Sequence, residues 1–441
     1  MTTLQEARRL RPRAVPGTTG KAARTTRTAR GTTATTTRAA ARIAAWSSPA
    51  TSYYLIGGAT ILLLLLGLVM VLSSSTVYSL RDTDSPFTGF LNQAKFALVA
   101  LPIAFGISRL RVSVFRRLAW VGMAGAGALQ LLLLVPSLRL SKGGNASWIV
   151  LGGQNLQPSE FAKLGLAIWL GAVLAAKGPL LRQWSHVLFP AVVVAGGFLG
   201  LVLYGNDVGT ALILIVLIGG ALWVAGVPTA MFAVAGTGVT AVVFFLVYFS
   251  PNRRGRIADF LGMGEADPMG VGLQPRHALQ GLGTGGISGV GLGASREKWL
   301  WLPEAHNDFI FAIIGEELGL LGTLLVLALF TALAIGLTRV IRRHPDPFVK
   351  ITTAAIGTWI IGQALVNIGV VIGLVPVIGV PLPLVSAGGS ALVTTLAALG
   401  VVLAFARSEP GAADALVARR GTVRKSLAVI APRLASGKTR D

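Results

Sequence analysis

Ionisable side chains gather in one polar stretch of this mostly apolar chain, between Pro251 and Gly322. Side chains of these types transfer protons and bind the charged groups of ligands. A long loop between membrane spans usually has a function, and charged groups inside a span are costly to keep. We therefore expect the chemistry of the protein here. The stretch includes Arg253, Arg254, Arg256, Asp259, Glu265, Asp267, Arg276, His277, Lys298, Glu304, His306, Asp308, Glu316 and Glu317.

The overall composition is that of a membrane protein. Of the 441 residues, 53% are hydrophobic and 13% are charged, and the mean hydropathy is +0.70. Soluble domains carry about 25% charged residues. The chain has no cysteine, which excludes disulfides, thiolate catalysis and cysteine-ligated metals.

Basic residues are concentrated at the two ends of the chain, whose net charge is +22. Neither end interleaves aromatic residues with its basic ones, so we expect no nucleic-acid partner. We expect residues 1–50 and 409–441 to be disordered cytoplasmic tails that contact anionic membrane lipids. The first apolar run, Tyr54–Leu72, is too long for a signal peptide and predicts a signal anchor.

Ten apolar segments are long enough to cross a membrane as helices, which takes about 20 residues each. No run between them alternates with the period of a strand. The segments cover residues 53–73, 90–108, 118–136, 158–176, 186–204, 208–226, 229–250, 308–338, 351–374 and 388–407.

The distribution of basic residues orients these segments. The most basic short connections are 109–117, 177–182 and 339–350, and the positive-inside rule places them in the cytoplasm together with both termini. The chain is therefore predicted to be an all-α polytopic membrane protein. Its membrane domain would span residues 51–408, with ten transmembrane helices and a large extracytoplasmic loop, 251–307, between helices 7 and 8.

Several charged positions near the predicted outer surface allow two interpretations. Glu160 and Lys163 are three residues apart and share a helix face, where they could form a structural pair or contact a polar headgroup. Asp207 precedes a predicted helix, where a carboxylate can cap the helix or bind a ligand. Glu316 and Glu317 are adjacent, so at least one should point into the bundle, where one of them could also pair with Lys163.

Glycine and proline are unusually dense between Gly373 and Ser390. They prevent regular helix and expose backbone groups, which is tolerated at membrane depth only inside protein or beside a wet cavity. This pattern favours a substrate groove.

Gly281–Gly286 matches the G-x-G-x-x-G fingerprint of dinucleotide sites. No strand precedes it, and the predicted topology places it outside the membrane, so we expect no nucleotide cofactor. The glycines are expected to let a flexible loop approach a ligand or partner closely.

From about Tyr54 to Arg407, the motifs together resemble the SEDS family of ten-helix peptidoglycan polymerases, which includes FtsW, RodA and SpoVE. Ala387 and the sequence Ala305–Asp308 are most similar to the FtsW type, whereas Ser147 departs from a basic residue found in many members. Four motifs carry the resemblance: Gln157-Pro158-Ser159-Glu160; Asp267-Pro268; Pro303–Ala312 with Gly315–Gly319; and Pro381–Leu384 with Ser386–Ser390.

The resemblance implies a glycosyltransferase that polymerises lipid II, an undecaprenyl-pyrophosphoryl disaccharide-pentapeptide, on the outer face during septal cell-wall synthesis. Asp267 matches the essential carboxylate of the family, which activates the acceptor hydroxyl as a general base or through a divalent cation, Mg²⁺ or Mn²⁺. Arg253, Arg256 and Lys298 are expected to stabilise the pyrophosphate leaving group. Further substrate contacts are expected from Glu160, Lys163, His306, Asp308, Ser386, Gly388 and Gly389, and structural roles inside the membrane from Asp207, Glu316 and Glu317.

The resemblance also implies a location and partners. The protein is expected in the inner or plasma membrane, at the division septum, with a class B penicillin-binding protein (an FtsI-like transpeptidase) and other divisome proteins. Three alternatives remain open at this point: a RodA-type elongation polymerase, a lipid II flippase, and a divisome scaffold without catalysis.

Overall fold

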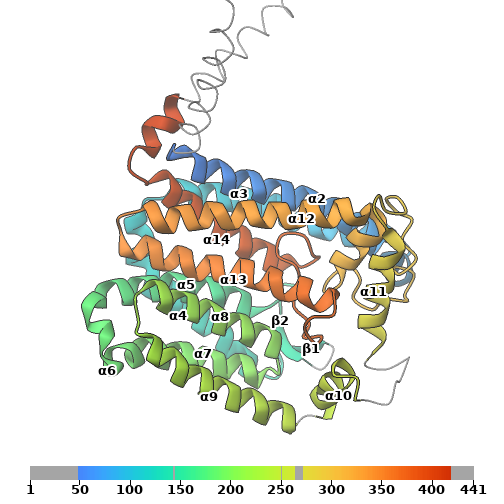
Figure 1. Cartoon of the computed structure of the whole chain (residues 1–441), viewed down its shortest axis with the longest axis horizontal. Helices are drawn as coiled ribbons and strands as arrows, with labels where there is room; N and C mark the ends of the chain where they lie inside the picture. Colours follow the sequence, from blue (N-terminus) through green and yellow to red (C-terminus); the bar gives the residue numbers. More distant parts are fainter. Residues whose placement is uncertain (1–47, 143–144, 250, 264–271, 419–441) are drawn as a thin grey trace, which may run out of the picture. The chain divides into compact units, whose positions relative to one another are not determined.

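The computed structural model describes residues 48–142, 145–249, 251–263 and 272–418, which belong to one compact unit (Figure 1). Within this part, eight helices are long and apolar enough to cross a membrane. Two shorter apolar helices lie at Val208–Val224 and Thr229–Phe245. Each of these helices overlaps one of the ten predicted segments, and the structure confirms eight of these as helices of spanning length.

The apolar helices are joined by short connections, except where the strands, the polar stretch or the irregular connection 372–388 intervene. One predicted span, 186–204, is built from a chain of short helical pieces. The elements are α2 (Ala50–Thr83), α3 (Thr88–Arg109), α4 (Val112–Leu131) with η1 (Leu132–Leu134), α5 (Pro158–Lys177), η2 (Gly178–Arg182), α6 (Trp184–Val187), η3 (Leu188–Val192), α7 (Val193–Tyr204), α8 (Val208–Val224), α9 (Thr229–Tyr248), α12 (Ile310–Arg343), α13 (Pro347–Val371) and α14 (Gly389–Arg407).

Helix starts follow from local chemistry. Pro158 occupies the first turn of α5, where its missing N–H costs no hydrogen bond. The carboxylates of Asp207 and Asp346 cap α8 and α13 by accepting from the backbone N–H groups of Thr210 and Phe348 at 2.9 and 3.0 Å.

Helices α13 and α14 form the centre of the bundle. Of the most apolar window in each, 72% and 78% of residues are buried, against 22% in α3. Helix α13 packs against α5, α8 and α12, while α14 packs against α3 and α2 (Figure 1). The less buried helices therefore present apolar side chains to lipid, as expected of a multi-pass membrane protein.

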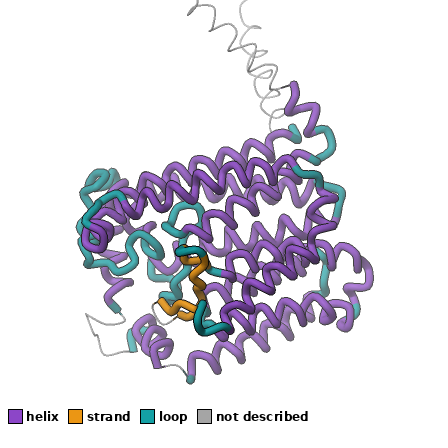
Figure 2. Tube along the Cα trace, turned by 180° about the vertical axis from the view of Figure 1, so that it is seen from behind, coloured by secondary structure: helices purple, strands orange, loops and turns teal. Residues whose placement is uncertain are grey.

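The connection between α4 and α5 contains a small antiparallel sheet that the absence of strand periodicity did not predict. Its strands are β1 (Arg139–Lys142), β2 (Asn145–Leu151) and β3 (Gln154–Leu156), in the order β1-β2-β3 (Figure 2). Gly152 and Gly153 form the turn between β2 and β3, with φ of 56° and 75°. A Gly-Gly pair favours such a two-residue hairpin, but the strands are too short to show a period of two.

The polar stretch is partly helical. It contains α10 (Pro251–Phe260) and α11 (Leu273–Gly285), followed by irregular structure up to Phe309. The predicted eighth span begins at Ile310 and is interrupted at Gly319, where φ is 66° and ψ is −162°. A Cβ at Gly319 would lie 2.3 Å from the backbone nitrogen of Gly289, so the interruption requires glycine.

The glycine fingerprint lies in and just after α11, not in a nucleotide-binding turn. A Cβ on Gly285 would lie 1.9 Å from the carbonyl oxygen of Gly315 in α12. Gly285 therefore allows two helices of the same chain to touch, which corrects the expectation of a flexible loop that approaches a ligand.

Candidate functional site

One cavity of about 1420 Å³ brings together the connections predicted to lie outside the membrane. The connections predicted to lie outside are 74–89, 137–157, 205–207, 251–307 and 375–387, and each contributes to the wall of the cavity. Representative lining residues are Gly89, Gln154, Asn206, Gln274 and Gly379. The segments predicted to face outward therefore do meet at one end of the helices.

The cavity continues between membrane helices as an apolar crevice. Its walls there are aliphatic side chains of α7, α8 and α9, including Leu199, Ile213 and Val242. A space with a polar mouth and an apolar extension is suited to a ligand that has a polar head and a hydrocarbon tail.

Glu160 and Lys163 form a buried ion pair on the cavity wall. The ammonium of Lys163 lies 2.8 Å from a Glu160 carboxylate oxygen and 3.1 Å from the side-chain oxygen of Gln363 in α13. It also lies 4.8 Å from the centre of the Trp359 ring. Lys163 therefore does not pair with Glu316 or Glu317, which was one sequence-based alternative.

Asp207 links α8 to the segment that follows strand β3 through side-chain hydrogen bonds. In addition to its capping bond, its carboxylate accepts hydrogen bonds from the Thr210 hydroxyl at 2.8 Å and the Gln157 amide at 2.9 Å. Burial raises the pKa of Asp207 above its usual value, and the bonds from Thr210 oppose that shift. Asp207 lines the cavity as well, so its structural role does not remove it from the site.

Several predicted substrate contacts line the cavity near the polar stretch. Arg256, on α10, donates to the Val377 carbonyl at 3.1 Å, and His306 lies with its ring centre 5.0 Å from that of Tyr78. Asp308 is also on the wall, and its carbonyl accepts from the Asn367 amide at 2.7 Å. Arg253 belongs to α10.

The Gly- and Pro-rich connection before α14 forms another part of the wall, as predicted for a groove. Gly388 and Gly389 line the cavity. Ser386 instead acts within the protein, because its hydroxyl donates to the Asn307 carbonyl at 2.6 Å and accepts from the Leu382 N–H at 2.8 Å. Gln93, from α3, holds this connection through the Ser386 carbonyl and the Gly388 N–H.

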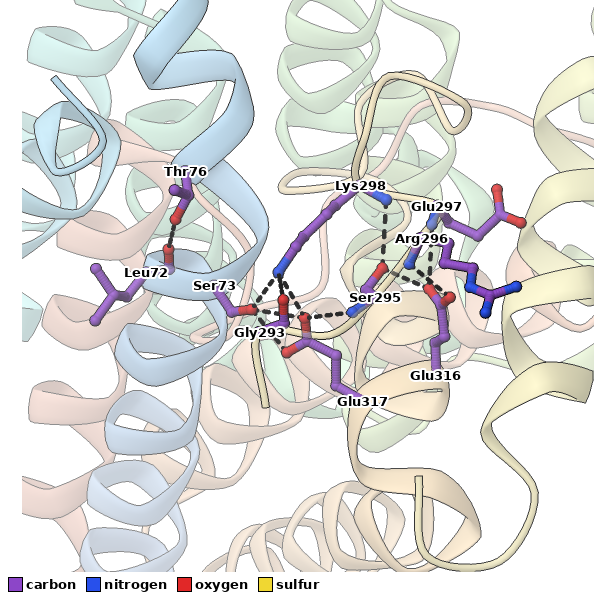
Figure 3. Close-up of polar contacts among 10 residues, drawn as sticks. All are labelled: Leu72, Ser73, Thr76, Gly293, Ser295, Arg296, Glu297, Lys298, Glu316 and Glu317. Atoms are coloured by element: carbon purple, nitrogen blue, oxygen red, sulfur yellow. Dashed lines mark hydrogen bonds and ion pairs between the residues drawn. The ribbon is translucent and has the colours of Figure 1, made fainter. Parts of the chain in front are cut away.

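Lys298 does not line the cavity; it is buried beside Glu317. Its ammonium lies 3.1 Å from a Glu317 oxygen and 3.3 Å from the Ser73 hydroxyl of α2 (Figure 3). Lys298 therefore connects the polar stretch to two membrane helices.

Glu316 and Glu317 are both buried, although adjacent residues of a helix point in different directions. Glu316 accepts from the Arg296 N–H at 2.8 Å and from the Ser295 hydroxyl at 2.5 Å (Figure 3). Both carboxylates are enclosed because the segment 286–298 folds around this end of α12. Their contacts hold that segment in place.

His277 and Glu297 form a third polar pair, between α11 and the irregular segment. Their side chains are 2.7 Å apart. Burial raises the pKa of the Glu297 carboxyl, while the bond from His277 opposes that rise.

Asp267, the predicted catalytic residue and metal ligand, lies outside the described residues. Among the residues that the structure does describe, no three His, Asp or Glu side chains are grouped so that they could hold a metal ion. The described donors do not by themselves fit a divalent cation.

Two glutamines on the site were missed from the sequence. The side chain of Gln363 accepts a hydrogen bond from Lys163 and donates one to the Pro381 carbonyl at 2.9 Å. The side chain of Gln93 hydrogen-bonds to the connection before α14. Each is an isolated polar residue within a predicted apolar span, and this feature could have marked it in the sequence as a candidate site residue.

Comparisons with known proteins agree with this architecture. The family model described as "Cell cycle protein" (FtsW, RodA, SpoVE) matches residues 54–410. A Mycobacterium tuberculosis protein described as a probable peptidoglycan glycosyltransferase FtsW is 39% identical over 383 residues, covering 86% of this chain and 72% of the relative. Stage V sporulation protein E of Bacillus subtilis is 36% identical over 342 residues, covering 77% of this chain and 93% of that protein.

Two solved structures are similar to the whole bundle. One reports the structural coordination of polymerization and crosslinking by a peptidoglycan synthase complex, with a TM-score of 0.65 at 27% identity, covering 80% of this chain and 96% of that one. The other is the rod shape determining protein RodA of Thermus thermophilus, with a TM-score of 0.59 at 27% identity, covering 81% and 97%. The chain belongs to the FtsW/RodA/SpoVE family.

Proposed function

We propose that the protein is a peptidoglycan glycosyltransferase that polymerises lipid II during septal cell-wall synthesis. The observation that carries the proposal is the single cavity in which the outer connections meet an apolar crevice between α7, α8 and α9. Lipid II has a polar disaccharide-peptide head, a pyrophosphate and a polyprenyl tail, so it matches both parts of this cavity. The names of the relatives, mostly FtsW, support the septal role over a RodA-type role in elongation.

The reaction transfers a glycosyl unit from a lipid pyrophosphate to a sugar hydroxyl. The hydroxyl oxygen attacks the anomeric carbon, the bond from that carbon to the pyrophosphate oxygen breaks, and the pyrophosphate leaves with the electron pair. We assign to Asp267 the role of accepting the hydroxyl proton, as the family resemblance implies. The helices on both sides of Asp267 in the sequence support this assignment, because Arg256 of α10 and Gln274 of α11 line the cavity.

Arg256 is the basic residue of α10 placed to stabilise the leaving group. A guanidinium has five N–H donors, and one of those of Arg256 is bonded to Val377. Arg253 is proposed to act beside it, whereas the pairing of Lys298 with Glu317 assigns Lys298 to holding the polar stretch. A divalent cation bound at Asp267 would supply further charge to the departing pyrophosphate.

The extent of the cavity argues against a flippase. The lining reaches Val192 and Ala235, in the helix halves nearer the predicted cytoplasmic side, but only apolar residues line it there, and no lining residue lies in the connections 109–117, 177–182 or 339–350. A carrier that moves a charged head across the membrane should have a polar path to the cytoplasmic end.

We further propose a class B penicillin-binding protein as partner, because one similar structure is that of a peptidoglycan synthase complex that couples polymerization with crosslinking. Both termini are assigned to the cytoplasm by the basic connections, and the protein to the division septum by the FtsW names of its relatives. Other divisome proteins are expected to join this complex.

The first test compares two carboxylates of the same polar stretch. Asp267→Ala and Asp267→Asn should abolish glycan-chain formation from purified lipid II in detergent, whereas Asp259→Asn, in α10, should polymerise like the unaltered protein. Matching unfolding temperatures would show that the variants are folded. Polymerisation by Asp267→Ala at the unaltered rate would contradict the catalytic assignment, and full activity in a chelator would exclude a required divalent cation.

A further inference from the structure

Neutral carboxamides are the largest class of polar side chain on the cavity wall. Ten of the lining residues are Asn or Gln. Four of them use their side-chain amides in hydrogen bonds to neighbouring protein groups; they are Gln93, Gln157, Asn307 and Gln363. The other six make no hydrogen bond through their amides within the described part of the chain; they are Asn92, Asn145, Gln154, Asn155, Asn206 and Gln274.

Four of these six amides belong to one platform, made of the hairpin β2–β3 and the turn between α7 and α8. Asn155 and Gln154 pair with Val150 and Leu151 across the hairpin. The start of β2 is tied to the turn, because the Ala146 N–H donates to the Gly205 carbonyl at 3.0 Å. This bond brings Asn145 and Asn206 into the same region. The platform is thus stabilised by backbone hydrogen bonds, which leaves its side-chain amides available to bind a ligand.

The backbone conformation at Asn206 allows its side chain to be removed without straining the turn. Its φ of 60° is in the left-handed region, and the adjacent Asp207 is fixed by its cap on α8. Glycine would adopt this conformation without strain. The backbone therefore does not need the asparagine side chain, which is exposed and lines the cavity.

Carboxamides suit one part of the substrate better than the others. Each carries two N–H donors and a carbonyl acceptor but no charge, so it can bind both sides of a secondary amide. Arg256, Glu304 and Asp308 line other segments of the wall, whereas Asp207, next to Asn206, has its carboxylate engaged by Thr210 and Gln157. A pyrophosphate is therefore better matched by the guanidinium of Arg256, and an uncharged amide by the platform.

We propose that the platform formed by Asn145, Gln154, Asn155 and Asn206, together with Gln274 of α11, which lines the same cavity, binds the secondary amides of the substrate head and so determines substrate specificity. This inference rests on the proposed function. The amides could belong to the N-acetyl groups of the sugars or to the stem peptide, and the two sources share the same hydrogen-bonding chemistry.

The test measures the initial rate of polymerisation against lipid II concentration, using the full-length protein in detergent. The combined variant Gln154→Ala, Asn155→Ala, Asn206→Gly should raise KM about fivefold for each hydrogen bond lost. Its kcat should stay close to that of the unaltered protein, because no proposed catalytic group is changed. An unchanged KM in a folded variant would overturn the inference while leaving the proposed function intact. Absence of polymerisation by the unaltered protein would instead contradict the proposed function.

A matched pair on α11 keeps the inference testable if the hairpin variant does not fold. Gln274 lines the cavity, whereas Gln280 is exposed on the same helix and does not line it. Gln274→Ala should raise KM and Gln280→Ala should not; equal KM values would overturn the inference. Repeating the measurements on lipid II with its peptide trimmed to one residue identifies the source. A KM increase that persists points to the N-acetyl groups, and one that disappears points to the peptide.

Discussion

At the scale of single residues, burial decides what the charged groups near the site can do. Lys163 is among the largest fully buried side chains, and its ammonium is surrounded by Glu160, Gln363 and the Trp359 ring. A buried charge is tolerated only with partners of this kind, so each member of the group depends on the others.

Removing one member of this pair should therefore cost more than removing both charges. Lys163→Met leaves the Glu160 carboxylate buried without its cation, which should lower the free energy of unfolding by about 3–5 kcal/mol. The double variant Glu160→Gln, Lys163→Met should lose clearly less. Thermal unfolding in detergent measures both changes. Glu160→Gln alone completes the cycle. If the double variant lost the sum of the changes in Lys163→Met and Glu160→Gln, the coupling between these groups would be refuted.

At the scale of secondary-structure elements, contact between α11 and α12 positions the polar stretch. Gly285 of α11 touches the backbone of Gly315 in α12, and the segment that follows is held by the backbone carbonyls and side chains of Glu316 and Glu317. The polar stretch is therefore not a free loop but a structure fitted to the outer end of a membrane helix.

Two glycines on α11 test this contact. Gly285→Ala should destabilise the protein by about 3 kcal/mol, the upper end for overpacking, because the new methyl group meets a backbone carbonyl that cannot rotate away. Gly283→Ala is the control, since a Cβ there meets no atom within 4 Å. That change should instead stabilise α11 by about 0.5–1 kcal/mol. Hydrogen exchange of residues 286–302 should increase only in Gly285→Ala; similar exchange in the two variants would argue against the contact.

At the scale of the whole molecule, polar contacts at the end opposite the cavity join segments from both ends of the described chain. The Ser52 hydroxyl of α2 donates to Glu409, which follows α14, at 3.4 Å. Arg339 of α12 donates to the Ser48 carbonyl at 3.2 Å. Burial raises the pKa of Glu409 above its ordinary value of 4.5, although the bond from Ser52 and the charges of Arg343 and Arg339 oppose the rise.

The raised pKa of Glu409 predicts how stability depends on pH. Folding favours the protonated carboxyl, so this contribution is fully present below pH 4.5 and is lost as the pH rises through the higher pKa of the folded state. Glu409→Gln should therefore be more stable than the unaltered protein at pH 7, and the difference should shrink towards pH 4. Unfolding temperatures across that range, with the exposed Asp414→Asn as control, measure the effect. A larger difference at low pH would reverse the sign and refute the argument.

The sequence alone determined the membrane character, the positions of ten apolar segments and the side on which their polar connections gather. These properties depend on local composition, on helix length and on basic residues near helix ends, and none of them requires knowing which helices touch. The motifs around Glu160, Asp207, His306 and Gly388 were likewise visible as departures from an apolar background.

The tertiary structure decided which of these groups share the cavity. Lys163 pairs with Glu160 and Gln363, and Lys298 pairs with Glu317 and does not line the cavity. The short hairpin brings to the cavity amides that make no hydrogen bond to the described part of the chain. Partners such as Lys163 and Gln363 are 200 residues apart in the chain. Sequence spacing predicts neighbours only within one helix or strand, whereas a cavity is formed by packing between elements, where side-chain volume and backbone approach select the partners.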